Sequence, residues 1–257
     1  KANSIKPCYT IPTNTIKSME LIFFFFALIS EVIGTMVGFG SSTIFLPIAS
    51  FILDFKTVLV LVAFHHLLGN LGRIAFFKYC IDKNLIIKFG LPSILFTIIG
   101  AFLAKNLPQE TLKAILGIFL ALYSVISLFR KDLQAKPTTA NNIIGGGISG
   151  FFAGLVGTGG ALRAAFLTSF NLPKEKYIAT VAIVAIAVDA TRIPIYLIDG
   201  SFSGQFYWYL PILFIIAISG SFIGKKIVSK IPQEKFKKLV FLAIFFVSIK
   251  FIYDFIS

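Results

Sequence analysis

The chain alternates between long apolar runs and short polar segments. Three of the runs, 85–104, 110–129 and 206–223, are predominantly apolar. Each is close to the roughly 20 residues that a helix needs to cross a hydrocarbon layer of about 30 Å. The runs do not alternate with a period of two between turn signals, so they predict helices rather than the strands of a membrane barrel. The pattern therefore predicts an all-α integral membrane protein.

The polar residues that punctuate these runs occur twice. At an offset of 119 residues, the second half repeats glycines, arginines and prolines of the first half without a gap. The matched pairs are Gly38 with Gly157, Gly40 with Gly159, Asn70 with Asp189, Arg73 with Arg192, and Pro92 with Pro211. Such matches are rare by chance in a chain this rich in Phe, Ile and Leu, so we interpret the chain as a tandem duplication.

Each half is expected to contain an apolar arm, a Gly-rich break with a short arm, and three long spans. Repeat 1 covers 19–130 and repeat 2 covers 143–257, with a polar linker at 131–142. Residues 1–18 are interpreted as a polar tail or a cloning remnant ahead of a natural start at Met19. The long spans are predicted near 57–77, 85–104, 110–129, 176–198, 206–224 and 234–254.

The short arms decide the predicted topology. The segment 43–53 has 11 residues, which as a helix extend about 16 Å, roughly half of the hydrocarbon layer. Such a segment cannot cross alone, so the arm 20–37, the break and the short arm are expected to form a re-entrant hairpin buried against protein or a watery cavity. Three crossings then remain in each half. This odd number predicts two inverted-topology repeats.

Composition and charge agree with this class. Of 257 residues, 57% are hydrophobic and 14% are charged, whereas soluble domains average about 25% charged residues. The net charge of +13 comes largely from lysines between apolar segments, and inversion places most of them in loops on one side, at 78–88, 130–136, 173–176 and 225–238. Because cytoplasmic loops are enriched in Lys and Arg, we expect these loops and the linker in the cytoplasm. The basic charge thus indicates a multi-pass protein of the cell (inner or plasma) membrane and no nucleic-acid partner.

Three arginines, Arg73, Arg163 and Arg192, lie within or beside the predicted spans. A charge at the bilayer centre is unfavourable by at least about 2.5–3.5 kcal/mol, so such residues usually face the protein interior. Asn70 precedes Arg73 by three residues, as Asp189 precedes Arg192, and residues at this spacing share one helical face. In an inverted repeat, the two pairs would line one cavity from two sides.

The Gly-rich breaks add further candidate donors. Residues after a break begin a half-helix, whose N-terminus presents free backbone N–H groups and the positive end of a dipole. Glycine lets a ligand approach the backbone closely, and hydroxyl groups donate hydrogen bonds. Together with arginines, such ends favour an anion with several oxygens, as in transporters with discontinuous helices. The candidate substrate-binding residues are Gly38, Gly40, Ser41, Ser42, Gly157, Thr158, Gly159, Gly160, Asn70, Arg73, Arg163, Asp189 and Arg192.

Purely structural roles are the alternative for several of these residues. Glycines in membrane helices often allow close helix packing. Arg192 can pair with Asp189 only to neutralise both charges, and Arg163 can extend to an interface. Arg73 has no acidic residue at the same spacing, which favours a ligand role for it.

A second group of residues could carry a coupling proton. Asp189 and Glu31 are acidic residues in apolar surroundings, and His65 and His66 lie in the middle of a span. The repeat counterparts of the two histidines are Val184 and Ala185, so the histidines are not part of the shared scaffold. For at least one of them, packing is the favoured interpretation.

The glycine pattern resembles a known family. The run GFFAGLVGTGG at 150–160, the earlier Gly38-x-Gly40 break and the duplicated length are similar to the sulfite exporter TauE/SafE family of membrane transporters, also called the TSUP family. The resemblance covers the chain from about Met19. The first break reads Gly40-Ser41-Ser42 where the family usually has three glycines, and Phe166 stands near the position of a frequent proline. The resemblance implies transport of sulfite, sulfonates or related sulfur-containing organic anions.

The sequence therefore predicts a secondary transporter of a small sulfur-containing oxyanion, of the sulfite, thiosulfate or organosulfonate class, that works by alternating access. The alternative is an anion channel that uses the same mid-membrane site as a filter. The sequence has no Ser/His/Asp triad or metal cluster, and Gly145-Gly146-Gly147 lacks the lysine of a nucleotide-binding loop, so no enzyme, metal or cofactor is expected. The expected partners are the oxyanion or organosulfonate, the lipid bilayer and a coupling proton or cation.

Overall fold

Both halves of the chain contain the same order of helices. The computed structural model describes residues 13–38, 40–77, 81–129, 136–198, 200, 202–227 and 233–256, and these ranges contain helices and no strand. The first half contains α1 (Thr13–Val37), α2 (Ser42–Ala49), α3 (Phe55–Phe77), α4 (Lys83–Asn106) and α5 (Gln109–Phe129). The second contains α6 (Thr139–Val156), α7 (Gly160–Leu167), η1 (Thr168–Phe170), α8 (Lys174–Ile198), η2 (Gly204–Phe206), α9 (Tyr209–Ile227) and α10 (Gln233–Ile256). The all-α prediction is confirmed.

Six segments of the described residues are long and apolar enough to cross a membrane: Ser18–Val37, Phe55–Phe76, Lys83–Asn106, Gln109–Phe129, Lys176–Ile198 and Gly204–Ile227. Five of them coincide with predicted crossings, and the predicted crossing at 234–254 corresponds to α10, a helix of 24 residues. The sixth candidate lies in α1, for which the sequence predicts only one arm of a hairpin. This helix begins earlier than predicted, at Thr13, because no proline interrupts it between Thr13 and Val37.

The two breaks have a backbone that favours glycine. Gly38 and Gly40 have φ angles of 85° and 92°, and Gly157 ends α6 with a φ of 77°. The helices that follow, α2 and α7, have 8 residues each, which is about 12 Å of helix. Both are shorter than the predicted arms at 43–53 and 161–172, because turns and a 3-10 helix complete those segments.

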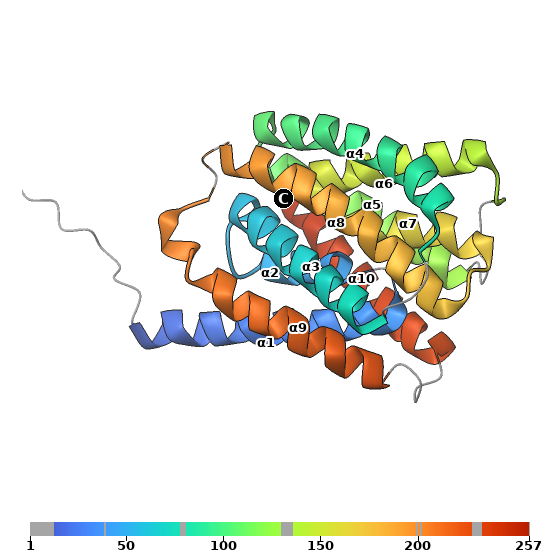
Figure 1. Cartoon of the computed structure of the whole chain (residues 1–257). Coiled ribbons are helices and arrows are strands. Elements are labelled where there is room, and N and C mark those ends of the chain that lie inside the picture. The colour runs from blue at the N-terminus through green and yellow to red at the C-terminus, as the bar shows by residue number, and fades with distance from the viewer. Residues whose placement is uncertain are drawn as a thin grey trace, which may run out of the picture.

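The helices pack in pairs that correspond when the halves are exchanged. Figure 1 shows α3 and α8 crossing at the centre, with α1 and α9 at one edge and α4 and α6 at the opposite edge. The pair α1 and α9 corresponds to α6 and α4, and the contact of α3 with α9 corresponds to that of α8 with α4. In the same view α3 begins at the left and α8 at the right, so these two counterparts run in opposite directions.

The glycines of α6 allow close packing of its backbone against that of α4. Ser93 Oγ donates to the carbonyl oxygen of Gly146 at 3.0 Å, and Thr97 Oγ1 donates to that of Gly150 at 3.0 Å. A Cβ atom on Gly150 would lie 2.1 Å from the carbonyl oxygen of Ser93. These glycines let two helix backbones touch, the packing role known for small residues in membrane helices.

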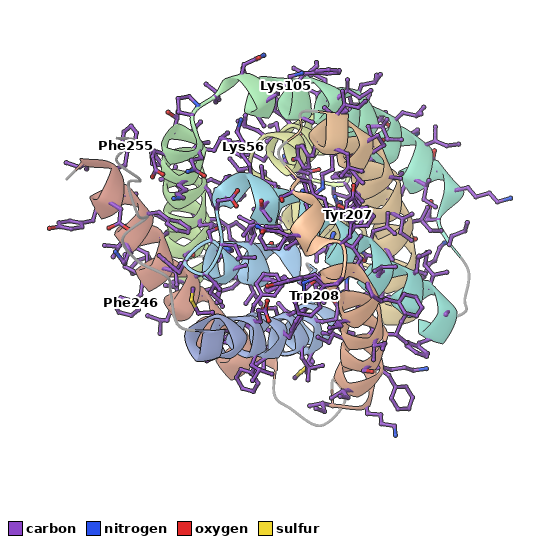
Figure 2. All side chains as sticks on the ribbon, turned by 90° about the vertical axis from the view of Figure 1, so that its left-hand side faces the viewer. Lys56, Lys105, Tyr207, Trp208, Phe246 and Phe255 are labelled. Carbon is purple, nitrogen blue, oxygen red and sulfur yellow. The ribbon has the colours of Figure 1, made fainter. Side chains whose placement is uncertain are left out.

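The outer surface is apolar. Phe246 and Phe255 point outward from α10, and Tyr207 and Trp208 lie exposed in the turn just before α9 (Figure 2). A surface of this kind suits contact with lipid, and amphipathic rings such as that of Trp208 are typical of the membrane–water interface.

Candidate functional site

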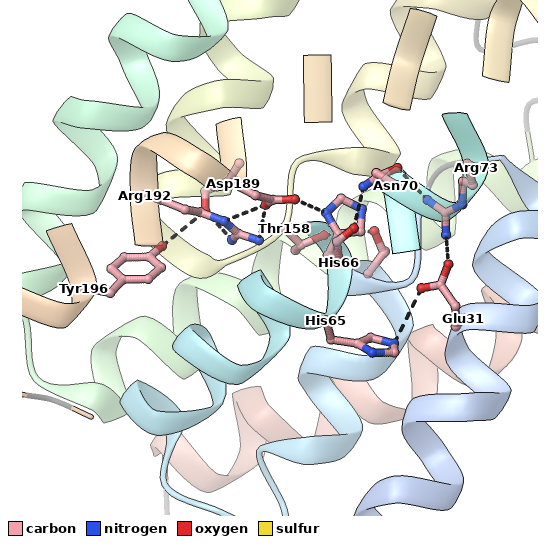
Figure 3. Close-up of polar contacts among 11 residues, drawn as sticks. Glu31, His65, His66, Asn70, Arg73, Thr158, Asp189, Arg192 and Tyr196 are labelled. Atoms are coloured by element: carbon pink, nitrogen blue, oxygen red, sulfur yellow. Dashed lines mark hydrogen bonds and ion pairs between the residues drawn. The ribbon is translucent and has the colours of Figure 1, made fainter. Parts of the chain in front are cut away.

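The charged side chains of the spans point into the protein. Arg73, Arg163 and Arg192 have exposed fractions of 5%, 2% and 1%, and Glu31 and Asp189 of 0% and 1%. Charges in a low-dielectric interior need partners, so the arrangement of these side chains is the most informative feature of the fold. Figure 3 shows two groups of contacts, one at Arg73 and one at Arg192.

The Arg73 cluster consists of Glu31, Thr35, His65, Asn70, Arg73 and Ser221. Arg73 donates from Nη2 to Glu31 Oε1 at 2.5 Å, from Nη1 to Asn70 Oδ1 at 2.8 Å and from Nε to Thr35 Oγ1 at 3.1 Å. Ser221 on α9 donates to Glu31 Oε1 at 2.8 Å. Three helices, α1, α3 and α9, therefore hold one ion pair.

This cluster corrects one premise of the sequence analysis. Arg73 has an acidic partner after all, because Glu31 reaches it from α1 across a sequence separation of 42 residues. Spacing along one helix cannot reveal a partner on another helix. Arg73 therefore belongs to an ion pair, and a ligand that binds it must compete with Glu31.

The Arg192 cluster consists of His66, Asp189, Arg192 and Tyr196. Asp189 Oδ1 accepts from Arg192 Nε at 2.9 Å and lies 2.7 Å from Arg192 Nη2. Asp189 Oδ2 lies 2.7 Å from His66 Nδ1. Arg192 Nη1 also donates to the carbonyl oxygen of Ala153 at 2.9 Å. The predicted pairing of Arg192 with Asp189 is thus present, and it also includes a histidine.

The two clusters are joined through α3. Asn70 Nδ2 donates to the backbone oxygen of His66 at 2.7 Å, while Asn70 Oδ1 accepts from Arg73. The path of contacts therefore runs without interruption from Arg192 through Asp189, His66 and Asn70 to Arg73, and on to Glu31 (Figure 3). Arg73 and Arg192 belong to one buried polar network.

The two glycine breaks meet at this network. Thr43 Oγ1, in the first turn of α2, lies 2.8 Å from Thr158 Oγ1 in the second break. A Cβ atom on Gly40 would lie 2.3 Å from His66 Nε2, and one on Gly157 would lie 3.5 Å from Arg192 Nη1. The missing side chain at Gly40 makes room for the imidazole, whereas the one at Gly157 makes room for Leu46 and Leu59, with the guanidinium of Arg192 at ordinary contact distance.

The other residues of the breaks are also enclosed. Ser41 caps α2 without a hydrogen bond from its own hydroxyl, and Ser42 begins that helix with 1% of its surface exposed. Gly160 begins α7, and a Cβ atom on Gly159 would lie 2.0 Å from the carbonyl oxygen of Ser149. Gly38 is the least enclosed, with Tyr177 of α8 as its nearest neighbour. For Gly159 the packing interpretation is sufficient.

Arg163 does not extend to an interface. Its side chain is buried, its backbone N–H donates to the carbonyl oxygen of Gly159 at 2.9 Å, and its Nε makes no hydrogen bond. A buried guanidinium with an unpaired N–H is rare, because removing such a donor from water without a partner is unfavourable. Arg163 is therefore a donor without a complete set of acceptors in the first turn of α7.

Sequence reasoning missed three residues of the network: Thr35, Tyr196 and Ser221. Tyr196 donates from its hydroxyl to the carbonyl oxygen of Gly154 at 2.5 Å, beside the contact of Arg192 with Ala153. All three are hydroxyl residues with no charge and no repeat match that would have drawn attention to them. Helical spacing is the only sequence signal, and it applies to two of them: Thr35 follows Glu31 by four residues, and Tyr196 follows Arg192 by four.

These features define a class. A helical chain with six candidate spans, an apolar outer surface and a buried network of charges is a multi-pass membrane protein. The family model of the sulfite exporter TauE/SafE family matches residues 22–251, nearly the whole chain. The chain therefore belongs to this family of membrane transporters, which are not enzymes. No curated protein and no solved structure gives a significant match to it.

Proposed function

We propose that this chain is a secondary transporter that carries a small sulfur-containing oxyanion across the cell membrane by alternating access. The observation that carries the proposal is the meeting of the two breaks, with Thr43 and Thr158 in contact, beside buried arginines. Backbone N–H groups at the starts of α2 and α7, together with guanidinium groups, suit an anion with several oxygens. Sulfite, thiosulfate and organosulfonates have this chemistry, and the family name points to the same class.

The site would lie between two halves of inverted topology. The correspondence of helix pairs and the opposite directions of α3 and α8 support this arrangement. In transporters built from inverted repeats, discontinuous helices form a site near the midplane, and one half moves against the other around it. The short helices α2 and α7 are the discontinuous elements here, each paired with a longer helix before it.

Arg163 is the residue best prepared to bind the anion directly. Arg73 and Arg192 are each held by a carboxylate, whereas Arg163 Nε has no hydrogen-bond partner. The repeat counterpart of Arg163 is Ile44, so only one half supplies this donor. The anion would therefore bind asymmetrically, closer to the start of α7.

Ligand-induced stabilisation tests the substrate class. Purified protein is heated in detergent with sulfite, thiosulfate, sulfate, a sulfonate or a carboxylate of matched charge. A ligand at 100 times its Kd adds about 2.7 kcal/mol to the stability of the folded state. We expect the sulfur oxyanions to raise the unfolding temperature and the carboxylate to leave it unchanged. Equal stabilisation by all anions would contradict the proposed class.

Transport in vesicles tests the mechanism. With reconstituted protein, we expect uptake of labelled anion that saturates with concentration and exchanges with unlabelled anion inside, and loss of both in Arg163→Gln. Lys113→Gln on the surface of α5 is the control variant. Single-channel currents that pass anions far faster than a carrier can would contradict the transporter mechanism and identify the protein as an anion channel.

A further inference from the structure

The charge of the buried network sets a condition on its ligand. Among the described residues, the buried arginines and carboxylates are Arg73, Arg163, Arg192, Glu31 and Asp189. With both histidines neutral, three guanidinium groups and two carboxylates leave one positive charge. A monovalent anion neutralises this charge, whereas a divalent anion leaves one negative charge in an environment that stabilises it poorly.

One part of the network is left incomplete. Glu31 Oε1 accepts from Arg73, Thr35 and Ser221, but Glu31 Oε2 makes no hydrogen bond. Its neighbour is His65 Nε2 at 3.5 Å, and neither nitrogen of His65 makes a hydrogen bond. Both side chains are 0% exposed. Buried polar atoms without partners call for an explanation, and here three of them belong to one acid–base pair.

We propose that the Glu31–His65 pair is a proton site, and that a divalent anion is transported together with one proton held by this pair. The inference rests on the proposed function. The proton comes from water on the side where the anion enters, binds to Glu31 Oε2 or His65 Nε2, and leaves with the anion on the other side. No other bond forms or breaks.

Arg73 connects the proton to the anion. When Glu31 is ionised, it holds Arg73 Nη2, and a dianion near Arg73 is repelled by the carboxylate. A proton on the pair weakens this hold, so the guanidinium becomes available to the anion. Proton binding and dianion binding therefore favour each other, and this coupling acts equally in both directions.

The groups around the pair are compatible with this role. From α3 the charged or titratable neighbours are Arg73 and His66, and the latter is paired with Asp189 of α8. From α1 and α9 the pair is approached by uncharged groups, the hydroxyls of Thr35 and Ser221 and the backbone of Leu213. The start of α2 adds the hydroxyl of Ser41 beside Glu31 and the ring of Phe45, 5.1 Å from the ring of His65. Arg73 is thus the charge through which the anion acts on the pair.

The test compares a dianion with a monoanion on the complete protein. Thiosulfate remains a dianion, and an alkyl monosulfonate a monoanion, over roughly pH 6 to 8, the range around the ordinary pKa of histidine. If one proton binds with the dianion, the apparent Kd of thiosulfate rises by up to about tenfold per pH unit, while that of the monosulfonate stays constant. A pH indicator in weak buffer should record one proton taken up per thiosulfate bound and none per monosulfonate.

Variants assign the proton to the pair. In Glu31→Gln, the pH dependence of thiosulfate binding should disappear, and in the exposed Glu110→Gln it should persist. If Glu31→Gln does not fold, His65→Gln replaces it, and the pH range over which the Kd of thiosulfate changes should then shift, because Glu31 alone holds the proton. Proton uptake of zero in the wild type, or an unchanged pH profile in the pair variant that folds, overturns the proposal. Binding of both anions without pH dependence leaves the transporter intact and removes only the coupling, whereas no binding of any anion removes the transporter itself.

Discussion

Thr43 and Thr158 touch through their hydroxyl groups at 2.8 Å, although 115 residues separate them in the chain. Each follows or lies within a glycine break, so this one contact joins the two halves at the point where both helices are interrupted. Both residues are almost fully buried. Each hydroxyl is therefore the hydrogen-bond partner of the other inside the protein.

A double-mutant cycle on this pair tests how much the contact contributes. Thr43→Val or Thr158→Val alone leaves a buried hydroxyl without a partner, and we expect a loss of about 1–3 kcal/mol in stability. The double variant removes both hydroxyls and should be less destabilised than the sum of the single variants. The measurement is the unfolding temperature in detergent, with the exposed Thr139→Val as control. Additive losses would show that the two hydroxyls do not act together.

Variants of the ion pair between Glu31 and Arg73 test whether the pair serves stability alone or transport as well. Arg73→Gln leaves Glu31 as a buried, uncompensated charge, which destabilises by about 3–5 kcal/mol. Adding Glu31→Gln removes that charge, so the double variant should recover most of the unfolding temperature. If Arg73 also serves the anion, the recovered protein still lacks normal transport. Full transport in the stable double variant would show that the pair is only structural.

Gly40 is expected to be needed for the position of His66. In Gly40→Ala, the new Cβ atom would lie 2.3 Å from His66 Nε2, and the alanine backbone would have to adopt a φ near 92°. Strained backbone of this kind is unfavourable by about 1–3 kcal/mol, and the clash also displaces the imidazole from Asp189. Gly200→Ala is a matched control, because Gly200 has a φ of 69° and no atom within 4 Å of its Cβ position. Gly40→Ala should reduce both stability and anion binding, and Gly200→Ala only stability; equal effects on binding would contradict the role of the contact.

Asp82 gives the fold a dependence on acidic pH. Its carboxylate accepts from the backbone N–H of Leu85 at 3.1 Å at the start of α4 and lies 3.1 Å from Lys176 Nζ on α8. The Leu85 N–H, with help from Lys176, holds the pKa of Asp82 below its usual value. Because the folded pKa is lowered, this stabilisation is present above the unfolded pKa of about 3.9 and is lost as pH falls through the folded value.

Melting curves of Asp82→Ala and Asp82→Asn test this contribution. At neutral pH, Asp82→Ala should lose about 0.5–2 kcal/mol, the usual effect of removing such a cap, and Asp82→Asn should lose less because an amide oxygen also caps a helix. The difference between wild type and Asp82→Ala should shrink as the pH falls below the unfolded pKa. A difference that stays constant down to the lowest pH at which the protein folds would exclude the ionised carboxylate as its cause.

The elements were predictable because they depend on local sequence. The length of each apolar run predicts a helix, and the matching glycines predict where the helices break, which agrees with Gly38, Gly40 and Gly157 at positive φ. The ends were less accurate, as α1 begins at Thr13 and α2 ends at Ala49. The predicted polar tail at 1–18 therefore overlaps α1, and its first 12 residues lie outside the described ranges.

The partners of the buried charges were not predictable from spacing. Asp189 and Arg192 are three residues apart, so helical geometry alone brings them together. Glu31 and Arg73 lie on different helices, and their contact depends on how α1 packs against α3, which periodicity does not encode. The same holds for His66 with Asp189, which depends on the crossing of α3 and α8.

Adjacent positions on α3 face different ways: His65 lies toward Glu31 of the first half, and His66 toward Asp189 of the second. Neighbouring residues on a helix point about 100° apart, so a twist of α3 moves both imidazoles relative to their carboxylates. One rigid helix thus carries the contacts to a carboxylate of each half, so a movement of α3 changes the surroundings of both acids together.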